Sequence, residues 1–174
     1  FPALQYLQCN NCNFASFDFD CVPTLEILRI YSNPLTTLIH TFPTGVKELY
    51  MSNTSNTTAN LVALSGTPAF STPHFPLLEV LFWDYAGVSD LLIPTQWPNM
   101  RVFVFGDPSG DPNPFFWTLT PTAWSNLEIF TYEQAPNVST DLNVILNSLV
   151  NGGASNAVIN IGFGNPPPDA LGCA

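Results

Sequence analysis

Positively charged residues are scarce in this sequence of 174 residues. Only Arg29, Lys47 and Arg101 face thirteen acidic residues, which gives a formal net charge of -10. A nucleic-acid-binding surface needs a basic stripe to neutralise phosphates, and three scattered cations do not form one. An anionic membrane surface is disfavoured for the same reason. We therefore predict that no nucleic acid is a partner of this chain.

Long apolar stretches are also missing. No run approaches the roughly 20 apolar residues of a membrane-spanning helix, so we predict no membrane insertion. The chain opens neither with Met nor with the basic-then-apolar pattern of a secretory signal, and we expect a mature form or a piece cut from a longer protein. The low share of charged residues, 9%, favours an extracellular, cell-surface or virion-surface location.

Catalytic motifs are absent from the sequence. It has no G-x-S-x-G or H-E-x-x-H motif, no phosphate-binding glycine loop and no dinucleotide fingerprint. His40 and His74 have no acid and nucleophile at a recognised spacing, and Asp18 and Asp20 alternate on an extended stretch as a solvated pair would. We predict a protein that is not an enzyme and that needs no cofactor.

An internal repeat is what the sequence does contain. The first three units begin at Leu4, Leu25 and Val46, 21 residues apart, and the later units are spaced more widely. Each unit places core-type residues at its first, fourth and sixth positions. In chain order these triplets are Leu4/Leu7/Cys9, Leu25/Leu28/Ile30, Val46/Leu49/Met51, Leu78/Leu81/Trp83, Met100/Phe103/Phe105, Leu127/Phe130/Tyr132 and a weaker Val158/Ile161/Phe163.

A second pattern accompanies the repeat. Just before each expected strand an apolar residue is followed by proline, which suits a turn that leads into a strand but not the strand interior. The pairs are Phe1-Pro2, Val22-Pro23, Phe42-Pro43, Phe75-Pro76 and Trp97-Pro98, and Trp124-Ser125 keeps only the aromatic residue. Two patterns in phase predict strands near residues 6–9, 27–30, 48–51, 80–83, 102–105 and 128–132.

The pattern resembles the leucine-rich repeat, L-x-x-L-x-L-x-x-N/C-x-L, with Cys12 and Asn33 at the Asn/Cys position. In that family the residue at this position hydrogen-bonds the backbone of the turn, inside the solenoid. Thr54 could do so more weakly, whereas Ala86, Pro108 and Ala135 could not. The resemblance implies one α/β leucine-rich-repeat domain over residues 1–174, with about six to seven units. A parallel sheet would form one face, and irregular loops plus a C-terminal helix the other.

Residues 139–165 are similar to the closing helix-strand segment of leucine-rich-repeat proteins from bacterial surfaces and phage particles. Four apolar residues at i, i+3, i+4 and i+7 predict one face of a helix, and they are Leu142, Ile145, Leu146 and Leu149. Ser139 or Thr140 could cap its start, and Gly152-Gly153 could end it. A strand from Val158 to Phe163 would follow.

The third, fifth and seventh positions of each unit should point away from the core, because strand side chains alternate. This outward surface is unusually apolar and predicts an interface. Its candidate binding residues are Tyr6, Arg29, Tyr31, Glu48, Tyr50, Phe82, Asp84, Val104 and Thr131. The alternative is that an insertion, residues 55–75 or 106–123, folds over it.

The four cysteines allow several interpretations. In the repeat register Cys9 replaces a core residue, and Cys12 occupies the position where the family tolerates a buried, hydrogen-bonding cysteine. A disulfide among Cys9, Cys12 and Cys21 and a zinc site are the alternatives, although no second ligand pair follows for zinc. Cys173 lies too far along the chain to meet the others and is a candidate for a disulfide between subunits.

Two further motifs concern ions and glycans. Residues 107–113 place oxygen ligands at every second position, as at the start of a calcium loop, but three prolines and the lack of a closing Glu weaken the match, and we predict no metal site. Asn53, Asn56 and Asn137 are possible N-glycosylation acceptors.

Two functions are compatible with these features. The first is an interaction or adhesion module on a cell or particle surface that binds a protein or a glycan through its sheet. The second is a structural subunit of a filament or virus particle that stacks end to end on copies of itself, since no polar capping unit precedes Phe1.

Overall fold

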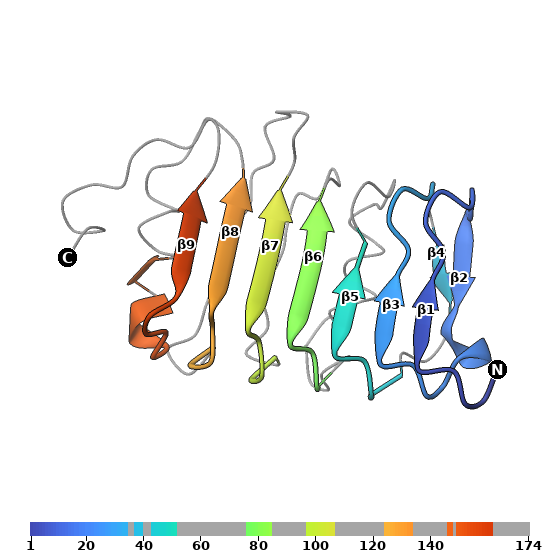
Figure 1. The fold of residues 1–174 in the computed structure, drawn as a ribbon, viewed down its shortest axis with the longest axis horizontal. Helices are drawn as coiled ribbons and strands as arrows, with labels where there is room; N and C mark the ends of the chain where they lie inside the picture. The colour runs from blue at the N-terminus through green and yellow to red at the C-terminus, as the bar shows by residue number, and fades with distance from the viewer. Residues whose placement is uncertain are drawn as a thin grey trace.

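A parallel sheet of seven strands organises the chain in the computed structural model (Figure 1). The structure describes residues 1–34, 37–39, 43–51, 76–84, 97–106, 124–133, 146–147 and 149–161. The strands of the sheet are β1 (Tyr6–Gln8), β3 (Ile27–Arg29), β5 (Glu48–Tyr50), β6 (Val80–Asp84), β7 (Val102–Gly106), β8 (Ile129–Glu133) and β9 (Val158–Ile161). They lie side by side in chain order, and little helix accompanies them, so the described part is α/β-like with the predicted parallel sheet.

The register of the sheet confirms the repeat in six units and corrects the seventh. Equivalent residues are 21, 21, 32, 22, 27 and 29 positions apart from β1 to β9. In the last pair Val158 lies opposite Ile129, and Ile159 opposite Phe130. The predicted triplet Val158/Ile161/Phe163 was therefore wrong by two residues, because Ile159 and Ile161 occupy the core-row positions.

Short turns lead into the strands and explain the second pattern. The amide of Leu25 donates to the carbonyl of Val22 at 3.1 Å, and the amide of Met100 donates to that of Trp97 at 3.1 Å. In both turns proline takes the second position, where its fixed φ fits. The third unit departs from the predicted phase. There the amide of Val46 donates to the carbonyl of Pro43 at 3.4 Å, so the proline occupies the first position of the turn and not the second.

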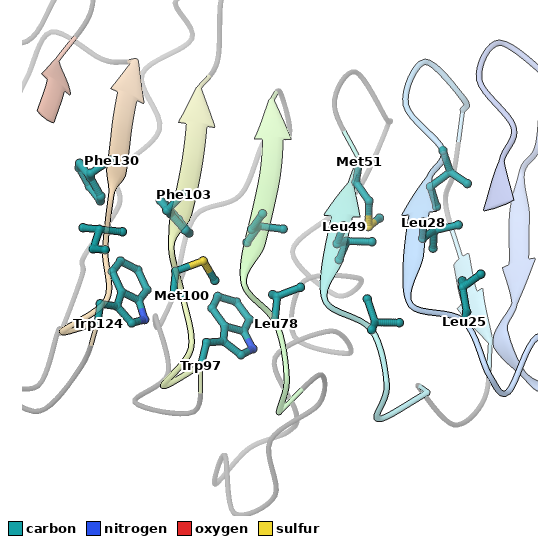
Figure 2. Close-up of a cluster of buried hydrophobic side chains, with 14 of the residues drawn as sticks. Leu25, Leu28, Leu49, Met51, Leu78, Trp97, Met100, Phe103, Trp124 and Phe130 are labelled. Atoms are coloured by element: carbon teal, nitrogen blue, oxygen red, sulfur yellow. The ribbon is translucent and has the colours of Figure 1, made fainter. Parts of the chain in front are cut away.

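The core lies on one side of the sheet (Figure 2). Its central row of fully or almost fully buried side chains runs from strand to strand as Leu28, Leu49, Leu81, Phe103 and Phe130. Burial of each such side chain stabilises the fold by about 1.5–3 kcal/mol. The first three members of this row are leucines, whereas the Phe103 ring stacks on Phe130 at 5.7 Å and contacts Trp124 at 5.1 Å. The central row thus changes from aliphatic to aromatic side chains between β6 and β7.

The first two units carry a second sheet, where irregular loops were expected. Strands β2 (Ser16–Asp18) and β4 (Thr37–Ile39) pair in parallel, again 21 residues apart. The 3-10 helix η1 (Phe19–Cys21) follows β2, with the Asp18 side chain accepting from the Asp20 amide at its start. Phe17 packs edge-on against Phe19, which is fully buried.

Asn33 connects these two units through its side chain, which is only 2% exposed. Its Oδ1 accepts from the amides of Cys12 at 2.9 Å and Phe14 at 3.2 Å. Its Nδ2 donates to the carbonyls of Cys9 at 2.7 Å, Ile30 at 2.8 Å and Tyr31 at 3.3 Å. One buried amide, with its two N–H groups shared among three carbonyls, therefore contacts five backbone groups of the turns that follow β1 and β3.

Cys12 was predicted to be a buried, hydrogen-bonding residue, and the prediction of burial is wrong. Its side chain is exposed, and its Sγ donates to the Asn10 carbonyl at 3.4 Å. The reason is geometric, since the backbone amide of Cys12, not its thiol, points to the buried side chain of Asn33.

Helical residues 146–147 and 149–151 precede β9, and Leu149 is buried in the core. The helix ends at the predicted glycines: Gly153 has φ 84°, and the Ala154 amide donates to the Leu149 carbonyl at 3.0 Å. Within the described residues no helix is long and apolar enough to cross a membrane.

Several predictions fall outside the described residues, and they concern the helix cap at 139–140, Thr54, the insertion 55–75 and nearly all of 106–123, the calcium-like loop 107–113, Asn53, Asn56, Asn137, Cys173, His40 and His74.

Candidate interaction surface

The side of the sheet opposite the core carries two rows of side chains, which we call the outer face. The strand register alone defines both rows. The first row is Tyr6, Ile27, Glu48, Val80, Val102, Ile129 and Val158. The second row is Gln8, Arg29, Tyr50, Phe82, Val104, Thr131 and Asn160. All fourteen residues are half-buried or exposed, whereas the central core row between them is buried from β3 to β8.

A stack of flat side chains occupies the N-terminal half of the outer face. The Arg29 guanidinium lies 4.5 Å from the ring centroid of Tyr50, and the Phe82 ring stacks on Tyr50 at 4.7 Å with an interplanar angle of 13°. The same guanidinium lies 5.7 Å from the Tyr6 ring. Strands about 4.8 Å apart place planar groups of one row face to face, and cation–π attraction adds to the contact. We call Tyr6, Arg29, Tyr50 and Phe82 the aromatic-arginine stack.

Polar groups of the first row orient this stack. The Tyr50 hydroxyl donates to Glu48 Oε2 at 3.2 Å, and Arg29 lies 3.7 Å from the same oxygen. Burial, and then the negative charge of Glu48, raises the pKa of Tyr50 above its ordinary value, so its hydroxyl remains a donor at neutral pH. The Tyr6 hydroxyl in turn donates to Gln8 Oε1. The stack therefore has fixed rings and directed hydroxyl groups.

The C-terminal half of the outer face is apolar and lined by β-branched residues. Val80, Val102 and Val104 are half-buried, Ile129 is 36% exposed and Val158 is 57% exposed. Such side chains stand upright on a strand and give a low, flat relief. The structure thus joins a polar-aromatic half and an apolar half in one continuous surface.

Most predicted binding residues meet on this surface. Tyr6 and Glu48 lie in the first row, and the second row contains the largest predicted group, namely Arg29, Tyr50, Phe82, Val104 and Thr131. Tyr31 follows the end of β3 and is half-buried, so it lies beyond the two rows. Asp84 ends β6 opposite Gly106, and its side chain lies outside the described set.

A row of charged residues beside the outer face was not predicted. It occupies the second position of each unit, directly before the strands, and we call it the charge row. It begins with the uncharged Gln5 and continues with the charged residues Glu26, Lys47, Glu79, Arg101 and Glu128. From Glu26 onward the charges alternate in sign. Comparison of the second positions of the repeat units would have found this row from the sequence.

Direct contacts connect most neighbours in the charge row. Lys47 Nζ lies 2.8 Å from Glu26 Oε2, and Arg101 donates from Nε to Glu128 at 2.9 Å and from Nη1 to Glu79 at 3.4 Å. The hydrogen bond to Glu26 raises the pKa of Lys47, and the hydrogen bond from Arg101 lowers the pKa of Glu128. All of these groups are solvent-accessible, so each pair contributes little stability.

The charge row also explains what the cations do. Lys47 and Arg101 pair within it, and Arg29 pairs with Glu48, so every Lys and Arg side chain has an acidic neighbour in the sheet. Among the described cations, the N-terminal ammonium of Phe1 instead donates to the Cys21 carbonyl at 2.9 Å. The described residues also contain no group of three or more His, Cys, Asp or Glu residues placed to bind a metal ion. A surface with these properties can bind by shape, apolar burial and directed hydrogen bonds.

Comparison with known proteins identifies no relative: no protein-family model, no curated protein and no solved structure matches this chain.

Proposed function

We propose that the chain is a leucine-rich-repeat solenoid whose outer face binds a protein partner, and that it is displayed outside a cell or on a particle. The fold part of the proposal is supported by the parallel strands in chain order, spaced 21 residues apart in the first units. The buried Asn33, which bonds five backbone groups at the family's Asn/Cys position, supports it further.

The observation that carries the binding proposal is the aromatic-arginine stack beside an apolar, flat half-face. Aromatic residues and arginine are the residue types enriched in the energetically dominant centres of protein interfaces. A continuous apolar surface of this kind is typical of an interaction site. Because the stack is already ordered by Glu48, little side-chain freedom would be lost when a partner binds.

The same geometry favours a protein over a glycan. Sugar rings pack their C–H groups on open aromatic faces, which requires one face of the ring to be free. Tyr50 has Arg29 on one face at 4.5 Å and Phe82 at 4.7 Å, in a nearly parallel stack. At its centre the stack therefore presents the edge and the hydroxyl group of Tyr50, which suit the mixed apolar and polar surface of a protein.

The test uses paired double variants of the purified chain. Tyr50→Ser with Phe82→Ser removes the centre of the stack, and we expect affinity for the partner to fall about 30-fold or more, as for hot-spot residues. Leu77→Ser with Val150→Ser is the matched control, since these apolar residues are 44% and 63% exposed but lie off the outer face. Proteins retained from the source's extracellular fluid are quantified by mass spectrometry for each form. If wild-type and both double variants retain the same proteins, the binding proposal is wrong.

One observation favours the alternative function, a structural subunit that stacks end to end. Ile159 occupies the core row opposite Phe130, yet it is 39% exposed while Phe130 is 0% exposed. The core thus opens at β9, where another copy of the chain could add to it. In that case sedimentation should show concentration-dependent assembly that Ile159→Glu abolishes. Assembly that reductant reverses would implicate Cys173, and a monomer of 19.0 kDa at all concentrations would exclude the alternative.

A further inference from the structure

We propose that Cys9 and Cys12 form a dithiol site that closes to a disulfide across the turn after β1. The proposal is independent of the binding function, since neither cysteine belongs to the outer face. Both thiols are free in the structure, and Cys21 is the third free cysteine of the described residues.

The backbone places the two thiols within reach of each other. Residues 10 and 11 form a turn, and Asn11 adopts a left-handed conformation with φ 56°. The first and last Cα atoms of a four-residue turn lie less than about 7 Å apart, a limit that nearly coincides with the roughly 4.4–6.8 Å range for disulfides. After burial, the neighbouring Cys12 is the next cause that raises the pKa of Cys9, as expected for two thiols that lie close together.

Asn33 holds both ends of this turn. Its Nδ2 donates to the Cys9 carbonyl at 2.7 Å, and its Oδ1 accepts from the Cys12 amide at 2.9 Å. A single buried side chain thus fixes the separation of the two cysteine backbones before any bond forms. This preorganisation lowers the entropic cost of ring closure.

The surroundings of the two thiols give them different roles. Cys12 is exposed and can meet an oxidant, whereas Cys9 is half-buried against the core. Burial, and then the neighbouring Cys12, raises the pKa of Cys9, so its thiolate is scarce while Cys12 is free and forms more readily once Cys12 is held in a neutral mixed disulfide. Cys12 is therefore the attacking residue and Cys9 the resolving residue.

The oxidant is a low-molecular-weight disulfide, RSSR, of the kind present in oxidising compartments. The Cys12 thiolate attacks one sulfur of RSSR, which forms a mixed disulfide and releases the first thiolate, RS⁻. The Cys9 thiolate then attacks the Cys12 sulfur, forms the Cys9–Cys12 bond and releases the second RS⁻. The two protons from the protein thiols convert both leaving groups to RSH, so two thiols are oxidised and one RSSR is reduced.

The test exposes the native chain to oxidised glutathione, blocks the remaining thiols by alkylation, and maps the peptides by mass spectrometry. We expect a Cys9–Cys12 disulfide, lighter than the reduced peptide by two hydrogen atoms and free of glutathione. Cys21 serves as the internal comparison, because it is exposed on η1 and should remain a thiol or keep its glutathione. A disulfide between Cys21 and either cysteine of the turn would overturn the proposal.

Two single variants separate the proposed roles. In Cys9→Ser the Cys12–glutathione adduct should persist on the order of 10-fold longer or more, because no intramolecular attack can resolve it. In Cys12→Ser no disulfide should form at Cys9. If Cys12 in the wild-type chain also keeps its glutathione, with the fold verified by circular dichroism, the two thiols do not form one site and the proposal fails.

Discussion

Replacement of Asn33 by Ala should destabilise the protein more than any other loss of a single amide group in the described residues. Asn33 is 2% exposed and makes five hydrogen bonds to backbone groups, between 2.7 and 3.3 Å. Each such bond contributes about 0.5–1.5 kcal/mol net, and orphaned buried partners cost more. We therefore expect a loss of about 5 kcal/mol in the free energy of unfolding, which is a large share of the about 5–15 kcal/mol typical of a domain.

Urea unfolding followed by circular dichroism measures this change. The matched control is Asn160→Ala, because the Asn160 amide is exposed and makes a hydrogen bond of 3.3 Å to Thr131, and its loss should cost about 0.5 kcal/mol or less. Asn33→Thr retains one donor and one acceptor and should fall between wild type and alanine. A loss in Asn33→Ala within about 1 kcal/mol of the control would refute the idea that this amide stabilises the turns.

Two further predictions concern the charge row. Because the hydrogen bond from Arg101 lowers the folded pKa of Glu128, this pair stabilises the protein above the ordinary pKa of 4.5, and the contribution is lost as pH falls through the lower folded value. Glu128→Gln should therefore flatten the acid side of the Tm-against-pH curve, and a variant curve parallel to wild type would contradict this. Lys47→Glu creates three successive acids with Glu26 and Glu79. Its Tm should fall below that of the Lys47→Gln control, and added salt should restore part of the difference.

The sequence predicted the sheet well wherever core-type residues left one choice of register. Glu26 and Arg29 lie between Leu25, Leu28 and Ile30, and only the phase that buries these three apolar residues keeps both charged residues out of the core. At β9, by contrast, Val158, Ile159 and Ile161 are all β-branched, and the apolar pattern fits two phases equally. Pairing with β8 selects the phase, and this information is absent from a local pattern. The strands β2 and β4 were missed for another reason: among the described residues only two units carry them, so no series of repeated positions marks them.

The sequence predicted which residues lie on the candidate surface, but not how their side chains pack against one another. Alternation along each strand identifies Arg29, Tyr50 and Phe82 as outward residues. That the guanidinium and the two rings form one ordered stack depends on side-chain rotamers and on Glu48 in the adjacent row. That both faces of Tyr50 are covered, which is the observation behind the preference for a protein over a glycan, therefore needed the structure.

The unequal spacing of the strands has a consequence for how such a protein can change. Between β3 and β5 the repeat is 21 residues, and between β5 and β6 it is 32, yet Leu49 pairs with Leu28 on one side and with Leu81 on the other in an unbroken row. The strands keep a constant register, and the segments that connect them differ in length without changing it. New sequence can accumulate in these segments, by evolution or by engineering, while the outer face keeps its geometry.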